Sequence, residues 1–221
     1  MPVENHSVIP INQDDIPAIG AFLQASKLQL TINRLLVKDW PNPTLQKAHY
    51  TRAIDNAVSN PNVTSLKVIN NVTGDAVAQL FYQKKSCAQE RKDELPEDSE
   101  EKQAKLEVPE SFTPAVYYAV MEAVDKLEPV LDTNEYIELT HMYVEPSSRR
   151  QGIGSWLLQI VQEAAVAAKL PLSLCSEPNY HSFFAKRGLK DQKHIDIDLA
   201  QWAAPYSGYG PFRLCRMVSQ E

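Results

Sequence analysis

The 221-residue sequence has few cysteines and glycines, no long apolar run and no excess of positive charge. Its three cysteines, Cys87, Cys175 and Cys215, are too few and too widely spaced for a disulfide framework or a zinc site. No run of about 18 apolar residues is present, which excludes an ordinary transmembrane helix. The first residues lack the charged-then-apolar pattern of a signal peptide. We therefore expect a cytoplasmic protein with no metal site and no membrane partner.

The net charge of −6 disfavours nucleic acid as a general partner, although it suits a cationic ligand. A chain of this length can bury a sizeable core, and we expect a single domain over residues 1–221, as a monomer or homodimer. One segment departs from this pattern. Over residues 86–111, acidic side chains outnumber basic ones by about two to one and aromatic side chains are absent. Such a composition predicts a mobile surface insertion.

Apolar periodicity divides the rest of the chain into helices and strands. Pro43 suits the first turn of a helix that ends at the Asn60-Pro61 step, and Thr113 suits the N-cap of a helix that begins at Pro114. In the latter helix the expected core-facing stripe is Tyr117, Val120, Met121, Val124 and Leu127. Predicted helices cover 12–27, 30–40, 43–59, 114–131, 153–169 and 180–188, and predicted strands cover 7–11, 64–70, 75–83, 136–144, 172–175, 189–199 and 212–218.

Two of the seven glycines, Gly152 and Gly154, lie at the start of an amphipathic helix, in the stretch "SSRRQGIGSWLLQIV". A helix N-terminus leaves backbone N–H groups unpaired and carries about half a positive charge. Glycine lets an anion approach that backbone closely, and Arg149 and Arg150 add side-chain charge. The stretch therefore predicts a pyrophosphate-binding loop.

The residues of this loop do not fit two other phosphate-binding patterns. A Walker-type loop needs lysine before the serine, but Gly154 precedes Ser155. The dinucleotide fingerprint needs a third glycine at the position of Leu157. The glycine pair alone is equally compatible with a simple strand-to-helix turn whose arginines are solvated.

The context of the loop is more specific. "RRQGIG" follows a strand that ends in "VEP", and a short strand and a helix ending in "AKRGL" come later. This arrangement resembles the coenzyme A signature of the GNAT superfamily of N-acetyltransferases, Gln/Arg-x-x-Gly-x-Gly/Ala, with Arg149, Gly152 and Gly154 at its defined positions. "SEPNYHSFFAKRGL" is also similar to fungal-type members. The resemblance implies an α/β fold: a mixed, largely antiparallel sheet of six to seven strands, flanked by helices and splayed at the coenzyme-binding strand.

The resemblance also implies acetyl-CoA as co-substrate and a set of residues that hold it. Backbone N–H groups from Arg150 to Ser155 would bind the pyrophosphate, and the strand before the loop would pair with the pantetheine arm. The Met142 N–H would stabilise the oxyanion that forms during attack. The implied coenzyme contacts are Met142, Tyr143, Val144, Arg149, Arg150, Gln151, Gly152, Ile153, Gly154, Ser155 and Phe184.

Amine acetylation needs a base, and Glu138 is the first candidate. It precedes Arg149 by the spacing at which the histone-modifying branch of the superfamily carries its glutamate, and burial among apolar neighbours would make it a stronger base. A structural ion pair with a basic neighbour is the alternative for Glu138. His141 is the second candidate, although a regular strand would place it on the opposite face and only a bulge would reverse that.

The acid that protonates the leaving thiolate does not stand at its usual position in this sequence. Many family members place a tyrosine four residues before the glycine of the last motif, and this sequence has Phe184 there. Tyr180 lies one helical turn away and becomes the candidate, with His181, Tyr143 or water as alternatives.

The predicted activity is acetyl transfer from acetyl-CoA to a primary amine, of a small molecule first, by direct attack in a ternary complex. A degenerate acyl-CoA-binding regulator and a protein or peptide N-acetyltransferase are the alternatives. Five aromatic side chains could form an acceptor pocket or serve as core and loop anchors. They are Trp40, Tyr50, Trp202, Tyr206 and Tyr209.

Overall fold

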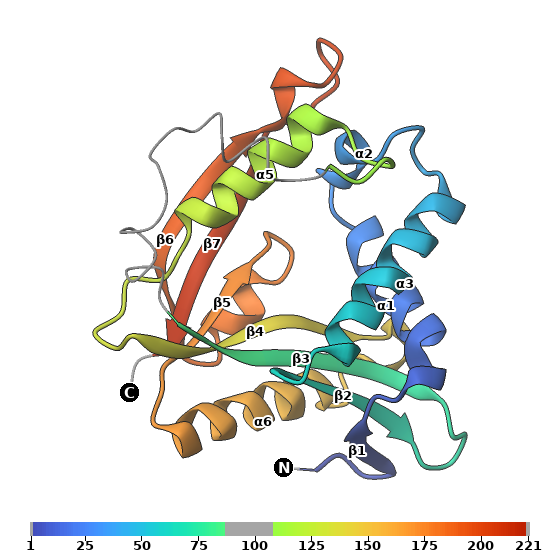
Figure 1. The fold of residues 1–221 in the computed structure, drawn as a ribbon, viewed down its shortest axis with the longest axis vertical. Helices are drawn as coiled ribbons and strands as arrows, with labels where there is room; N and C mark the ends of the chain where they lie inside the picture. The colour runs from blue at the N-terminus through green and yellow to red at the C-terminus, as the bar shows by residue number, and fades with distance from the viewer. Residues whose placement is uncertain (1, 87–107, 220–221) are drawn as a thin grey trace.

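Seven strands form one sheet in the order β1-β2-β3-β4-β5-β7-β6 (Figure 1). The computed structural model describes residues 2–86 and 108–219, so most of the predicted acidic insertion lies outside the described residues. Only β4 and β5 pair in parallel, which confirms the expected mixed, largely antiparallel sheet. The strands are β1 (His6–Pro10), β2 (Val63–Asn70), β3 (Ala76–Ser86), β4 (Glu135–Val144), β5 (Leu172–Ser176), β6 (Leu189–Asp198) and β7 (Pro211–Ser219).

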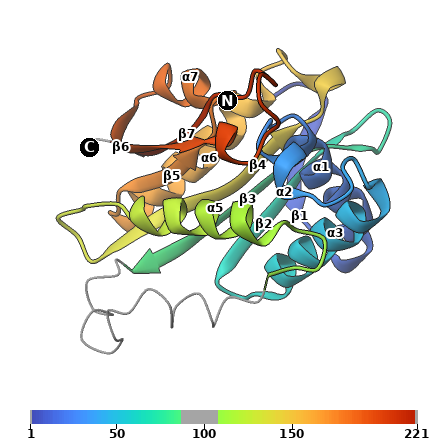
Figure 2. The ribbon, with the colours of Figure 1, turned by 90° about the horizontal axis from the view of Figure 1, so that it is seen from above.

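Helices cover both faces of this sheet. Helix α6 packs on one face, α1 and α3 pack on the other, and α5 lies against β6 and β7 (Figures 1 and 2). No described helix is long and apolar enough to cross a membrane. The helices are α1 (Ile16–Leu28), α2 (Asn33–Leu36), α3 (Pro43–Ser59), α5 (Pro114–Lys126), α6 (Ile153–Ala168) and α7 (His181–Ala185), with short 3-10 helices η1 (Gln13–Asp15), η3 (Pro146–Ser148) and η4 (Leu199–Gln201).

Local sequence signals explain where these helices begin. Pro43 is in the first turn of α3, and the Asn42 side chain accepts a hydrogen bond from the Leu45 N–H. Thr113 has extended backbone angles before Pro114 opens α5. Helix α2 is much shorter than the predicted 30–40 helix, because Val37 turns to an extended conformation and pairs with Phe112.

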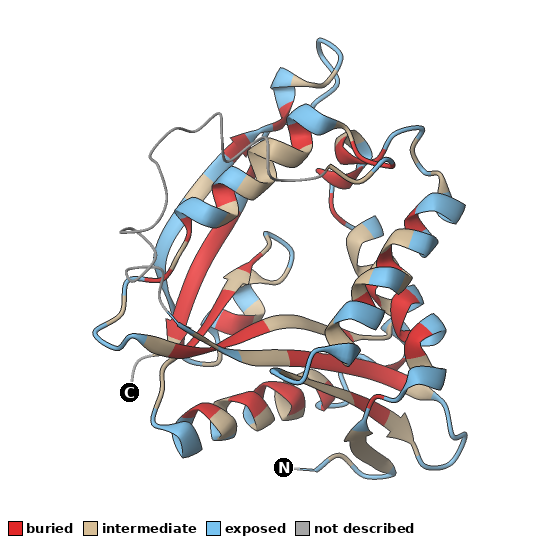
Figure 3. Ribbon diagram, viewed as in Figure 1, coloured by how far each residue is buried: buried red, intermediate tan, exposed pale blue. Residues whose placement is uncertain are grey.

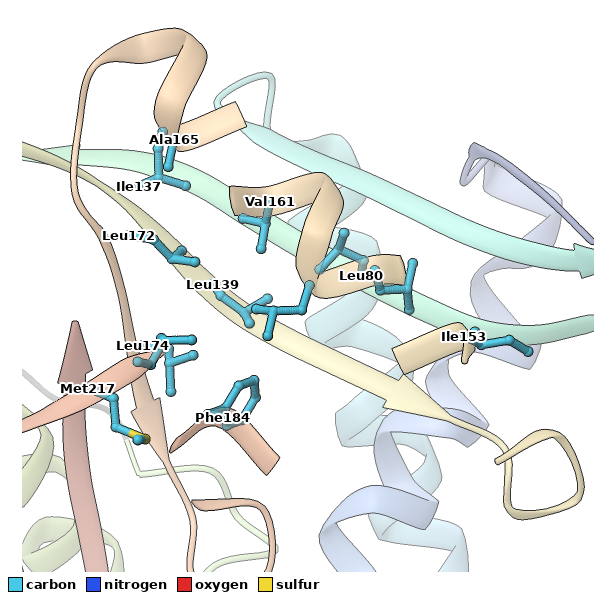
Figure 4. Packing of buried hydrophobic residues seen from close by; sticks show 14 of the residues in the cluster. Leu80, Ile137, Leu139, Ile153, Val161, Ala165, Leu172, Leu174, Phe184 and Met217 are labelled. Carbon is cyan, nitrogen blue, oxygen red and sulfur yellow. The ribbon is translucent and has the colours of Figure 1, made fainter. Parts of the chain in front are cut away.

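The main core lies between the sheet and α6 (Figures 3 and 4). Leu139, Leu80 and Val161 meet there, with Phe184 at one end. A second cluster joins α2 and α5 to β6 and β7, and a third joins α1 and α3 to Phe81 of β3.

The buried face of α5 differs from the predicted stripe. Among the five predicted residues only Leu127 is fully buried, and Val116 and Ala123 complete the buried face. Tyr117, Val120 and Val124 are half-buried and pack against the second cluster, so four of the five predicted residues face the core and Met121 does not.

Strands β4 and β5 pair over a short length and then separate. Their register covers only Ile137 to Leu139 against Leu172 to Leu174, and this confirms the predicted splay. A bulge at Thr140 follows directly, because Leu139 pairs with Tyr82 and His141 pairs with Phe81. One extra residue reverses the alternation of side chains. Glu138 and His141 therefore project from the same face of the sheet.

Candidate active site

A cavity of about 690 Å³ opens where β4 and β5 separate. Its walls come from the end of α1, the outer half of β4, the start of α6, the end of β5 and α7. Gln151 and Ile153 do not line it: Gln151 is exposed and Ile153 is buried in the main core. The predicted residues that do line it are His141, Met142, Tyr143, Val144, Arg149, Arg150, Gly152, Gly154, Ser155, Tyr180 and Phe184.

The loop before α6 has the geometry of an anion-binding helix N-terminus. Gly152 is the N-cap, with a left-handed φ of 92° that favours glycine. The first helical hydrogen bond runs from the Trp156 N–H to the Gly152 carbonyl, so the preceding N–H groups have no acceptor within the helix. A Cβ added to Gly154 would lie 3.4 Å from the Phe183 ring, an ordinary van der Waals distance, so packing against Phe183 alone does not require glycine there.

Three arginines surround this helix N-terminus. Arg149 donates from Nε to the Val144 carbonyl at 2.9 Å and lies over the Tyr143 ring. Arg187, which sequence analysis did not single out, donates to the Ser155 hydroxyl from Nε and Nη2 at 3.1 and 2.8 Å. Its only signal was its place before the glycine of "AKRGL". Free N–H groups, three cations and apolar walls fit a ligand that carries phosphates on an apolar arm.

The outer half of β4 exposes backbone groups to the cavity. The Glu145 N–H bonds to the Val77 carbonyl of β3 at 2.9 Å. Because strand residues alternate in direction, the N–H groups of Met142 and Val144 point to the opposite edge, from which β5 has separated. This placement is the one that the predicted coenzyme pairing requires.

Glu138 lies outside this cavity, in a buried network. Its two carboxylate oxygens bind Arg216 Nη1 at 3.2 Å and Lys85 Nζ at 2.7 Å. Arg216 is 2% exposed and also donates to the Leu127 carbonyl and the Ser173 hydroxyl. The expectation of a carboxylate among apolar neighbours is therefore wrong, because two cations already occupy it. The structure shows the alternative, a structural ion pair.

His141 lies in the cavity wall. The bulge at Thr140 turns its side chain to this face of the sheet. Burial, helped by the positive charge of Lys27, lowers the pKa of His141 to about 3. The imidazole is therefore neutral at pH 7. Among the described residues, neither ring nitrogen has a hydrogen-bond partner, so one of them can accept a hydrogen bond from a ligand or water.

The lowered pKa of His141 predicts acid-sensitive stability. The unfolded chain takes up this proton near pH 6.5 and the folded chain only near pH 3, so stability is lost as pH falls between these values. The limiting slope is about 1.4 kcal/mol per pH unit. Urea unfolding from pH 5 to 8 should show a smaller slope in His141→Gln than in the wild type. An unchanged slope in the variant would show that His141 is not the group that makes stability acid-sensitive. Burial also lowers the pKa of His49, but His49 is present in both proteins and contributes equally to both slopes.

Lys27 and Glu177 form an ion pair inside the same cavity, with Nζ and Oε1 2.5 Å apart. Lys27 lies at the end of α1, and Glu177 directly follows β5, 150 positions later in the sequence. Burial raises the pKa of the nearby Cys175 thiol to about 11, which keeps it protonated. Sequence analysis missed both charged residues: Lys27 stands in no motif, and Glu177 lies in the segment "SEPNYHSFFAKRGL" without a role that the pattern assigns to it.

Of the acid candidates, Tyr180 and Tyr143 line the cavity and His181 does not. The Tyr180 hydroxyl donates to Gln29 Oε1 at 3.3 Å. His181 instead contacts Asp191 at 2.7 Å. The fold brings His181, Asp191 and Cys215 together, with possible ligand atoms within 4.8 Å of one another, although the cysteine spacing suggested no metal site.

The five aromatic side chains considered for an acceptor pocket do not line the described cavity. Tyr50 is buried in the third cluster, where burial raises its pKa. Trp40, Trp202 and Tyr209 pack against the second cluster, and Tyr206 is fully exposed. In this structure they are core and loop anchors.

Known proteins share this fold. Residues 78–196 match the family described as "Acetyltransferase (GNAT) domain", which is more than half of the chain. No curated protein matches the sequence. A Drosophila melanogaster polyamine N-acetyltransferase that forms N-acetylagmatine has a TM-score of 0.67 at 14% identity, with 98% of this chain and 100% of that chain covered. Arylalkylamine N-acetyltransferase 2 from Aedes aegypti has a TM-score of 0.63 at 15% identity, with 98% and 99% covered.

A plant protein, Arabidopsis thaliana NAA60 in complex with a bisubstrate analogue, has a TM-score of 0.54 at 9% identity, with 96% of each chain covered. At such identities the likeness shows a common fold. The expected fold class is confirmed, whereas the fungal-type subgroup finds no support in these comparisons.

Proposed function

The chain belongs to the GNAT acetyltransferase family, and on this premise we propose that it transfers an acetyl group from acetyl-CoA to the primary amine of a small molecule by direct attack. The observation that carries the proposal is the position of the α6 N-terminus beside an open strand edge in one cavity. When bound, acetyl-CoA supplies an activated thioester. Every other part of the reaction below is assigned to residues of this chain.

The coenzyme side of the cavity would be held by backbone and arginine groups. Unpaired N–H groups at the start of α6 bind phosphate oxygens, and Arg149, Arg150 and Arg187 add charge. The N–H groups of Met142 and Val144 pair with the extended arm along the open edge. The Met142 N–H also donates to the carbonyl oxygen of the acetyl group.

The proton transfers are assigned to residues of the inner wall. His141 takes a proton from the acceptor ammonium, directly or through one water, because its ring lies in the cavity wall. Its low pKa makes it a weak base, so it passes this proton on to water. Tyr180 carries a hydroxyl in the same wall and protonates the departing sulfur. Both side chains bear ionisable groups where a regulator that only binds the coenzyme would need none, which supports an enzyme.

A small amine is favoured as acceptor over a peptide. Solved structures with this fold include enzymes described as a polyamine N-acetyltransferase and an arylalkylamine N-acetyltransferase, which supports a small amine as acceptor. The cavity also contains a carboxylate, Glu177, which a cationic acceptor would bind in competition with Lys27.

Separate substitutions of His141 and Glu138 test which residue is the base. His141→Gln should lower kcat by roughly tenfold to a hundredfold at neutral pH, while calorimetry shows little change in acetyl-CoA affinity. The defect should shrink as pH rises, because the free amine then needs no base. Glu138→Gln should keep most of the turnover in the same thiol-release assay. Normal turnover in His141→Gln would remove His141 from the mechanism.

The choice of acceptor is tested with a panel of polyamines, arylalkylamines and peptides. Thiol release with small amines supports the proposal, and release with peptides alone would move the activity to proteins. Binding of acetyl-CoA without release for any acceptor would favour the regulatory alternative.

A further inference from the structure

Several described lysines are paired with carboxylates, but only Lys27 lines the cavity. Lys67 binds Asp15 and Lys85 binds Glu138, both away from the cavity wall. Lys27 is about one quarter exposed and its partner Glu177 about one fifth. A primary amine of the protein therefore lies in the chamber where the acceptor amine is expected.

The position of Lys27 within the cavity is set by one ion pair. Its ammonium binds Glu177, which follows directly on the last residue of β5. Its charge also acts on His141 of β4 and on Cys175 of β5. Lys27 and Glu177 line the same cavity as the residues of β4 from Leu139 to Val144, so the ammonium shares a chamber with the open edge assigned to the thioester.

We propose that Lys27 is a self-acetylation site, modified by acetyl-CoA bound in its own cavity; this inference rests on the proposed function. Glu177 accepts one proton from the Lys27 ammonium, and the free amine then attacks the acetyl carbonyl carbon. The carbon–nitrogen bond forms, the carbon–sulfur bond breaks, and the second amine proton goes to the departing thiolate. The products are acetyl-Lys27 and coenzyme A, with the Glu177 proton released to solvent.

Proximity makes this reaction competitive with modification from solution. An amine held beside a bound acyl group reacts as if it were present at very high concentration. Its ion pair is the main obstacle, because the attack requires the free amine. The rate should therefore rise with pH.

Acetylation would change the charge of the cavity. The Lys27–Glu177 pair carries no net charge, and acetyl-Lys27 leaves the Glu177 carboxylate with its charge unpaired. A carboxylate without its internal ammonium partner attracts a cationic acceptor more strongly. Self-acetylation would thus set the preference of the cavity for cationic amines.

Peptide mass spectrometry tests the proposal. The purified protein is incubated with acetyl-CoA without acceptor, and the acetyl mass at each lysine is followed with time. Lys27 should be modified at least roughly tenfold faster than Lys85, which is paired in the same way outside the cavity. The Lys27 rate should saturate with acetyl-CoA and be independent of protein concentration.

Lys27→Arg keeps the positive charge and should show no fast acetylation, whereas Lys85→Arg should behave as the wild type. Slow modification of all exposed lysines, in linear proportion to acetyl-CoA, would overturn the proposal. Calorimetry with acetyl-CoA and the panel of amines distinguish a failure of the self-acetylation proposal from a failure of the proposed function. If acetyl-CoA binds and amines are acetylated but Lys27 is unmodified, only the self-acetylation falls. If acetyl-CoA does not bind, the proposed function falls as well.

Discussion

Gly152→Val should weaken acetyl-CoA binding by about a hundredfold, which corresponds to about 2.7 kcal/mol. Gly152 has a φ of 92° at the start of α6, and a β-branched residue is strained at this angle. The valine side chain would also stand beside the N–H groups that receive the phosphates. Isothermal calorimetry with acetyl-CoA measures the effect directly.

Gly74→Val is the matched control for this change. Gly74 also has a left-handed φ, of 78°, and lies in the turn between β2 and β3, with open space around the added Cβ. Both variants should lose a similar amount of stability, about 1–3 kcal/mol, from backbone strain. Only Gly152→Val should lose affinity. Equal affinity in the two variants would show that the loop does not bind the coenzyme.

Arg216→Met should lower the free energy of unfolding by about 3–5 kcal/mol. Arg216 is buried and connects Glu138 of β4, Ser173 of β5 and the Leu127 carbonyl after α5. Methionine fills similar space, but it leaves the buried Glu138 carboxylate with Lys85 alone. Urea unfolding at neutral pH measures the loss.

Two further variants identify the cause. Arg213→Met, on the same strand, removes an exposed pair with Asp196 and should change stability far less. Glu138→Gln in the Arg216→Met background should recover part of the loss, because it removes the unpaired charge. A double variant no more stable than Arg216→Met would mean that packing, rather than charge, makes Arg216 necessary.

Features with a local cause could be predicted from the sequence. Helix α3 begins at Pro43, α5 follows Thr113, and Gly152 caps α6, because proline, threonine and glycine act on the backbone at their own positions. The binding loop before α6 could be placed for the same reason.

Features that depend on distant partners could not. The bulge at Thr140 exists only in the pairing of β4 with β3, and no residue of β4 signals it. This bulge places the side chains of His141 and Glu138 on the same face of the sheet. Arg216 meets Glu138 across 78 positions, and Lys27 meets Glu177 across 150. Such contacts follow from strand order, which periodicity within single segments does not contain.

The short parallel ladder between β4 and β5 has a consequence for folding kinetics. Strands β1 to β4 come from one continuous part of the chain and β5 to β7 from another, and only the ladder from Ile137 to Leu139 joins them within the sheet. Pairing this ladder closes a loop that contains the whole of α6, at a cost in chain entropy that three residue pairs repay poorly. We expect the two parts to form first and the ladder last, with the burial of Arg216 completing the native contacts between them.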